Sequence, residues 1–233
     1  MPRSPSCPIV TIDGPSGSGK GTISRAVARH AGWHLLDSGA LYRLVALAGV
    51  AAGAASEDAQ RHAELTASMA VAFGSGPDGS ERVWLDGRDV TGAIRTETAG
   101  QGASRVAAWP AVRAALLERQ RAFARPPGLV ADGRDMGTVV FPQADLKIFL
   151  TATLEERALR RHKQYKQLKD KGSDVSLPAL SREIAERDLR DQTRQVAPLR
   201  PAPDACVIDS TGLEVEAVVG RVLELMAARR LWR

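Results

Sequence analysis

Short apolar runs alternate along the chain with longer segments in which apolar residues return every three or four positions. The short runs cover residues 9–12, 33–36, 129–131, 146–150 and 206–208. After the first run, Ile23, Val27 and Ala31 recur at helical spacing and define one apolar face. Strands and helices in regular succession are typical of a parallel sheet with helices on both faces. We therefore predict an α/β fold with a five-stranded parallel sheet.

The pattern changes between residues 65 and 97. Met69, Val71 and Phe73 alternate with polar or small residues, a turn-rich stretch follows, and Val83 and Leu85 alternate again. This pattern is typical of a β-hairpin. Because a loop of this length without structure of its own would be unusual, we predict a small inserted subdomain that contains β-structure.

Helical periodicity returns in the second half of the chain. Residues 98–109, a segment that starts at Pro110, residues 178–194 and residues 215–226 each fit a helix. Thr153 to Glu156 fits a capping box that opens a basic helix. Residues 168–176 break the periodicity and predict a mobile tip.

A glycine-rich stretch joins the first apolar run to the first helix. It consists of Gly14, Pro15, Ser16, Gly17, Ser18, Gly19, Lys20, Gly21 and Thr22. Glycines let backbone N–H groups close on phosphate oxygens, the helix N-terminus adds partial positive charge, and a lysine adds a full charge. Gly21 stands where the general motif has a hydroxyl residue, which leaves the metal-ligating hydroxyl open. The strand before it and the helix after it favour a phosphate loop over an ordinary glycine-rich surface loop.

Composition narrows the class of protein and its partners. The 233 residues are 44% hydrophobic and 25% charged, which is ordinary for a single globular domain. The net charge of +5 fits nucleic acid, a membrane surface or small anions. Aromatic residues make up only 4% and none is interleaved with the basic clusters, so small phosphates are the better partners.

Cysteine usage and apolar run length bear on the cellular compartment. Cys7 and Cys206 are too few and too far apart for a zinc site or a disulfide framework. Residues 44–55, the most apolar run, are too short to span a membrane, and no targeting segment precedes the phosphate loop. We therefore expect a soluble cytoplasmic protein.

Several charged residues could take part in phosphoryl transfer, which depends on positioned positive charge. Arg187, Asp191 and Arg194 share one helix face, which could point inward and bind a phosphate and a sugar hydroxyl. The spacing alone favours a solvated face with salt bridges four residues apart, and both interpretations stay open. None of the four histidines shows the spacing of a catalytic triad or a metal site.

Asp132 follows the apolar run 129–131 and could hold a hydrated Mg²⁺ beside the phosphate loop. Arg134 would face the same site, although an ordinary Asp-Gly turn is the simpler alternative. Arg157 and Arg161 are spaced to clamp donor phosphates from a helix, but a surface charge network with the neighbouring glutamates fits equally well.

The chain resembles the bacterial cytidylate kinases of the nucleoside monophosphate kinase superfamily nearly from end to end. The similar segments are 12–17, 33–39, 131–142 and 186–199. In that family Gly21 followed by Thr22 is the usual order, so the departure from the general motif supports the resemblance. The resemblance implies a P-loop kinase fold and transfer of the ATP γ-phosphoryl group to CMP or dCMP with Mg²⁺.

The resemblance also implies roles for individual residues. The loop from Gly14 to Thr22, with Arg157 and Arg161, would bind ATP, and Thr22 and Asp132 would hold Mg²⁺, in part through water. Ser38, Arg43, Arg134 and Arg194 would meet the acceptor phosphate; Ser104, Arg113 and Asp135 would read cytosine; Arg187 and Asp191 would hold the ribose. Lys20, Arg134, Arg161 and Arg194 would carry the catalytic charge.

The resemblance further implies one kinase domain over residues 1–233. Its core would cover about 1–64, 98–156 and 177–233, with a monophosphate-binding insert at 65–97 and a helical lid at 157–176. The expected partners are the small-molecule substrates ATP and CMP or dCMP, and neither nucleic acid nor a membrane is expected to bind. The protein is expected to be a monomer.

A phosphate loop is also compatible with other functions. Another small-molecule kinase would share the donor half and differ at Ser104, Arg113 and Asp135. A GTPase switch would need the guanine-reading Asn-Lys-x-Asp sequence, and the chain contains no asparagine. A nucleic-acid-stimulated ATPase would show basic residues interleaved with aromatics.

Overall fold

The computed structural model describes residues 7–76, 80–167 and 176–231. Contacts divide the chain into two compact units, Met1–Asp37 with Arg121–Arg233, and Ser38–Gln120. The first unit contains a five-stranded sheet and the second a three-stranded sheet. Within the described residues no helix is long and apolar enough to cross a membrane.

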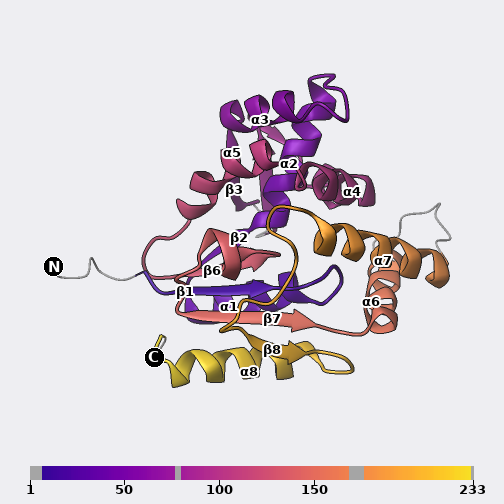
Figure 1. Ribbon diagram of the computed structural model, residues 1–233. Helices are drawn as coiled ribbons and strands as arrows, with labels where there is room; N and C mark the ends of the chain where they lie inside the picture. Colours follow the sequence, from indigo (N-terminus) through magenta and orange to yellow (C-terminus); the bar gives the residue numbers. More distant parts are fainter. Residues whose placement is uncertain (1–6, 77–79, 168–175, 232–233) are drawn as a thin grey trace. The chain divides into compact units, whose positions relative to one another are not determined.

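The five-stranded sheet of the first unit is parallel throughout, as predicted (Figure 1). Its order is β2 (His34–Asp37), β6 (Leu129–Gly133), β1 (Ile9–Asp13), β7 (Leu146–Thr151) and β8 (Cys206–Asp209). Asp132 on β6 pairs with Ile12 on β1 and with Asp37 on β2. Because parallel strands end at one edge, Asp13, Asp37 and Asp132 come together beside the phosphate loop.

Helical segments cover both faces of this sheet. Helices α1 (Lys20–Ala31) and α8 (Val215–Ala228) pack on one face, where they form an apolar core with side chains such as Val10, Ile12 and Ile148. Thr11 and Asp13 point to the other face of β1, which the short π-helix η2 (Met136–Val140) covers. Burying each large apolar side chain stabilises the fold by about 1.5–3 kcal/mol, so the alternation along β1 fixes which face receives α1.

Two further helices complete the first unit, α6 (Leu154–Gln167) and α7 (Leu177–Thr193). Ser176 caps α7, since its Oγ accepts from Ala179 N at 3.4 Å. The rest of the tip predicted at 168–176 lies outside the described residues.

The capping box predicted at α6 is only half correct. Glu156 N donates to Thr153 Oγ1 at 3.3 Å, as a capping box requires. The reciprocal bond is replaced by other contacts, because Thr153 N donates to Thr211 Oγ1 at 3.0 Å and the Glu156 carboxylate accepts from Arg160 Nε at 2.8 Å. A loop distant in sequence therefore supplies the acceptor that the local pattern assigned to Glu156.

The second unit combines helices with the predicted hairpin. Strands β3 (Val71–Ser75), β4 (Glu81–Leu85) and β5 (Arg88–Asp89) form an antiparallel sheet in which Phe73 pairs with Val83. The helical segments are α2 (Ser38–Ala51), α3 (Ala59–Ser68), η1 (Ala93–Arg95), α4 (Glu97–Val106) and α5 (Pro110–Arg121), the last residue of which belongs to the first unit. The functional boundaries at 65–97 stay a prediction, since the compact unit is larger.

Candidate active site

The phosphate loop links the end of β1 to the start of α1. Gly17 and Gly19 have φ angles of +79° and +90°, in the left-handed region that favours glycine, and Gly19 is the N-cap of α1. Lys20 extends back across the loop, where Nζ donates to the Pro15 carbonyl at 3.1 Å. A turn of this kind at a helix N-terminus is suited to binding an anion.

Lys20 and Asp132 form an electrostatic pair beside the loop. Burial lowers the pKa of Lys20, and the positive charge of Arg134 lowers it further, while Asp132 opposes the change. Burial raises the pKa of Asp132, against the effect of Lys20 and Arg134. Arg134 therefore lies close enough to affect both members of the pair.

The geometry around Asp132 fits a hydrated divalent cation. Its Oδ1 is buried and accepts no hydrogen bond from the described residues. Magnesium commonly uses one or two carboxylates and keeps several waters. Within the described residues, no group of three or more His, Cys, Asp or Glu that could hold a metal occurs. Thr22, the other candidate ligand, is exposed at the start of α1.

Position 21 explains the departure from the general loop motif. A β-carbon at Gly21 would lie 3.2 Å from Asp132 Oδ2 and 3.4 Å from Arg25 Nη2. These are tight distances, and a hydroxyl side chain would need still more room. Glycine therefore leaves space for the Asp132 carboxylate and the Arg25 guanidinium to approach α1 together.

The residues predicted for the acceptor meet where the segment after β6 faces α7. Arg134 Nε donates to Asp191 Oδ2 at 2.9 Å, and Arg194 Nη2 lies 3.9 Å from Asp135 Oδ1. Asp191 is 4% exposed and Asp135 is 2% exposed, so the solvated-face interpretation of α7 is wrong. Arg187, which is half-buried, lies four residues before Asp191 on the same side of α7, as the spacing predicts.

The charge of Asp191 is stabilised despite its burial. Burial raises the pKa of this carboxyl, but the three arginines Arg134, Arg187 and Arg194 outweigh burial and lower it. Asp191 is therefore ionised and orients Arg134. The cluster retains excess positive charge, which is what an acceptor phosphate requires.

Asp13 links the loop strand to the segment that follows Asp135. Its Oδ1 accepts from Met136 N at 2.9 Å and its Oδ2 from Gly137 N at 2.8 Å. Burial raises the pKa of Asp13 to about 7, and Asp135 and Asp132 contribute to the rise, while the two N–H donors oppose it. The carboxylate thus fixes the start of η2 against β1.

The basic residues of α6 differ in what they contact. Arg157 donates to Ala152 O at 3.1 Å and Ser16 O at 3.0 Å, and pairs with the buried Asp188. Arg161 Nη1 donates to Gln164 Oε1 at 3.3 Å. Arg157 thus contacts the phosphate loop through a carbonyl, and direct contact of either arginine with donor phosphates stays a prediction.

The remaining predicted acceptor residues belong to the second unit. Ser38, Ser104 and Arg113 are buried within it. Arg113 Nη1 donates to Ala107 O at 3.2 Å, and its guanidinium lies 5.7 Å from the centre of the Tyr42 ring. Arg43 Nη1 donates to Ile94 O at 3.0 Å. These contacts of Arg113 and Arg43 lie within the second unit, and binding of one acceptor by these residues together with Arg134 stays a prediction.

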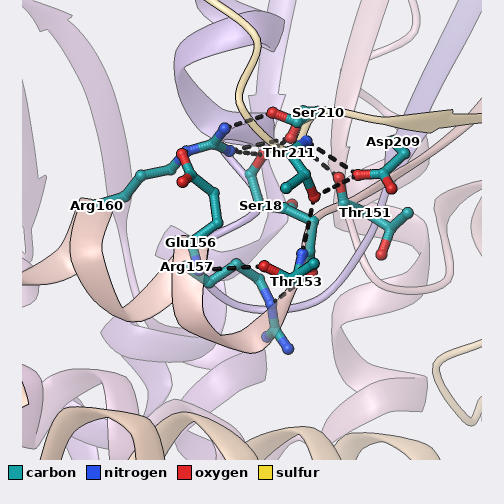
Figure 2. Close-up of polar contacts among 10 residues, drawn as sticks. Ser18, Thr151, Thr153, Glu156, Arg157, Arg160, Asp209, Ser210 and Thr211 are labelled. Atoms are coloured by element: carbon teal, nitrogen blue, oxygen red, sulfur yellow. Dashed lines mark hydrogen bonds and ion pairs between the residues drawn. The ribbon is translucent and has the colours of Figure 1, made fainter.

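Three residues at the loop, Asp13, Arg160 and Ser210, had no predicted role. Asp13 is marked in the sequence only as a carboxylate at the end of the first strand. Arg160 and Ser210 join at the Ser18 carbonyl (Figure 2). Glu156, four residues before Arg160, is the one local signal that this arginine is oriented.

The loop, the buried carboxylate beside it and the arginine cluster between α7 and the segment after β6 together define a P-loop phosphotransferase. The family model for cytidylate kinase matches residues 10–228. The chain therefore belongs to the cytidylate kinase family.

Individual relatives agree with the family match. A cytidylate kinase of Methylococcus capsulatus is 58% identical over 212 residues, covering 91% of this chain and 93% of the relative. Cytidylate kinases of Stutzerimonas stutzeri and Azotobacter vinelandii are 57% and 55% identical; the first match covers 96% of this chain and 97% of the relative, and the second covers 96% of each. The similarity thus includes both compact units.

Proposed function

We propose that the protein transfers the γ-phosphoryl group of ATP to CMP or dCMP, giving ADP and CDP or dCDP. The observation that carries the proposal is the cluster in which Asp191 orients Arg134 near Lys20 of the phosphate loop. It combines an anion-binding loop for the donor with oriented positive charge for a second phosphate. Membership of the cytidylate kinase family supports CMP as the molecule that carries this second phosphate.

On the donor side, the loop and Lys20 hold the phosphates of ATP. Asp132 and Thr22 would hold Mg²⁺, in part through water, and the ion would neutralise charge on the donor phosphates when bound. The other donor-binding residues are Gly14, Pro15, Ser16, Gly17, Ser18, Gly19, Gly21, Arg157 and Arg161.

On the acceptor side, the proposed contacts divide by chemical group. Charged groups suit these contacts, because an ionic hydrogen bond contributes about 1.5–3 kcal/mol and an unmatched buried group is costly. The phosphate contacts are Ser38, Arg43, Arg134 and Arg194; the cytosine contacts are Ser104, Arg113 and Asp135; the ribose contacts are Arg187 and Asp191.

The reaction forms one bond and breaks one. An oxygen of the CMP phosphate attacks the γ-phosphorus in line, and the bond from that phosphorus to the oxygen of the ADP leaving group breaks. Negative charge spreads over the transferred group as this happens. Lys20, Arg134, Arg161 and Arg194 would neutralise that charge, and exclusion of water would prevent hydrolysis.

We also propose a cellular location, an oligomeric state and a division of the chain into functional segments. The protein would act as a cytoplasmic monomer without nucleic acid or membrane. Its core would bind ATP, residues 65–97 would form the monophosphate-binding insert, and residues 157–176 would form the lid.

The proposal is tested by measuring ADP formation from ATP and Mg²⁺ with CMP, dCMP, UMP, AMP and GMP in turn. CMP or dCMP should give the highest kcat/KM, and chelating the metal should abolish turnover. A preference for AMP, or no turnover with any monophosphate, would overturn it.

A further inference from the structure

Nearly all the N–H donors of the Arg160 side chain bind groups within the protein. Nε donates to Glu156 at 2.8 Å, Nη1 to Ser18 O at 3.2 Å and to Ser210 Oγ at 3.0 Å, and Nη2 to Ser210 O at 2.6 Å (Figure 2). A guanidinium has five N–H donors, and these contacts use four. Arg160 is therefore committed to the loop and to Ser210, in a planar arrangement that a lysine cannot reproduce.

The Ser18 carbonyl is the point where these contacts meet the phosphate loop. Besides Arg160, the Ser210 hydroxyl lies 3.2 Å from this carbonyl and 2.9 Å from Thr151 O. Ser18 is thus held by α6 and by the loop after β8, which are 142 and 192 residues away in sequence.

Peptide geometry turns this contact into a constraint on the phosphate-binding side. The peptide unit is planar and trans, so the Ser18 carbonyl and the Gly19 N–H point in opposite directions. Gly19, at φ +90°, lacks the side chain that would otherwise restrict rotation of this peptide. Fixing the carbonyl toward Arg160 and Ser210 therefore points the Gly19 N–H away from them.

The same relation holds one helical turn earlier on α6. Arg157 Nη1 donates to Ser16 O, and the next residue in the loop is Gly17, at φ +79°. The two arginines thus hold alternate carbonyls of the loop, each immediately before a glycine in the left-handed region. Such alternation leaves both glycine N–H groups on the opposite side.

We propose that Arg160, held in place by Ser210, is a positioning residue that orients the Gly19 N–H toward the donor phosphates. Arg157 acts in the same way on Gly17. The inference rests on the proposed function only in taking the ligand of the loop to be a nucleoside triphosphate or diphosphate. Since Arg160 acts through the Ser18 carbonyl, its removal should weaken phosphate binding without touching the acceptor half.

Steady-state kinetics with Arg160→Ala, Arg160→Lys and Ser210→Ala test this role, with Arg221→Ala as a matched control at an exposed arginine on α8. Arg160→Ala and Arg160→Lys should each raise KM for ATP about tenfold, while KM for CMP stays within twofold. Ser210→Ala should give a smaller rise, because Arg160 still reaches the Ser18 and Ser210 carbonyls. An unchanged KM for ATP, or an equal rise for both substrates, would overturn the role.

A spectroscopic readout separates this inference from the activity itself. In glycine-¹⁵N-labelled protein, ADP should shift the Gly19 amide strongly, and Arg160→Ala should reduce that shift more than it reduces the shift of Gly17. This result is expected whatever monophosphate the enzyme accepts. An undiminished Gly19 shift in Arg160→Ala, with the melting temperature at the wild-type value, would refute the positioning role even if CMP is the substrate.

Discussion

Replacing Asp13 by Asn tests how the loop strand is tied to η2. In the structure the Asp13 carboxylate accepts from two peptide N–H groups in a buried site, where burial raises its pKa to about 7. The nearby Asp135 and Asp132 add to the rise. Asn has a similar shape but does not titrate, so the substitution isolates the proton linkage of this one carboxyl.

Proton linkage gives the sign and the size of the change in unfolding free energy with pH. An aspartate in the unfolded chain has a pKa of about 3.9, so the folded protein binds the Asp13 proton more tightly than the unfolded chain does. The contribution of Asp13 to stability is therefore complete at low pH and is lost as the pH rises from about 4 to about 7. Between pH 5 and pH 8, the free energy of unfolding should fall by about 2–3 kcal/mol through this group.

Urea unfolding of wild type and Asp13→Asn at pH 5, 6, 7 and 8 measures this effect as a difference. The stability of Asp13→Asn relative to wild type should rise by about 2–3 kcal/mol across the series. Glu214→Gln removes an exposed carboxylate and serves as the control. It shows how much of the pH-dependent stability difference arises from the loss of an ordinary surface carboxylate. A difference that stays constant within about 0.5 kcal/mol would refute the raised pKa.

Four further substitutions test the site. Arg134→Ala should lower kcat about 100-fold, since it removes charge that balances the transferred phosphoryl group; an effect confined to KM would contradict this. Asp135→Ala should mainly reduce the ratio of kcat/KM for CMP over UMP, and an unchanged ratio would exclude its base-reading role. Gly21→Ser should raise the Mg²⁺ concentration for half-maximal activity severalfold by crowding Asp132, whereas an unaltered Mg²⁺ titration would show that position 21 tolerates a side chain. Arg157→Ala should destabilise the protein by about 3–5 kcal/mol in urea unfolding, because it leaves Asp188 buried without its partner; a loss under 1 kcal/mol would contradict that.

The sequence predicts the sheet and the phosphate loop well because both depend on local patterns. Each strand of the large sheet is a short apolar run, and the loop is a contiguous motif between strand and helix. The hairpin of the second unit is likewise visible in the alternation of Val71, Phe73, Val83 and Leu85.

The contacts that organise the site are less predictable because they join distant segments. Arg134 and Asp191 are 57 residues apart, and Asp13 and Gly137 are 124 apart. Spacing on α7 identified a shared face but favoured solvent over burial, since helical periodicity does not say what packs against a helix. Only the reciprocal half of the capping box was wrong, for the same reason, because Thr211 supplies the acceptor for Thr153 N.

The most direct test of the central claim is ³¹P NMR of ATP, Mg²⁺ and an equimolar mixture of CMP, UMP, AMP and GMP with catalytic enzyme. The account predicts that CDP and ADP resonances grow together at equal rates before any other diphosphate increases. Inorganic phosphate as the main product, or AMP as the preferred acceptor, would contradict it.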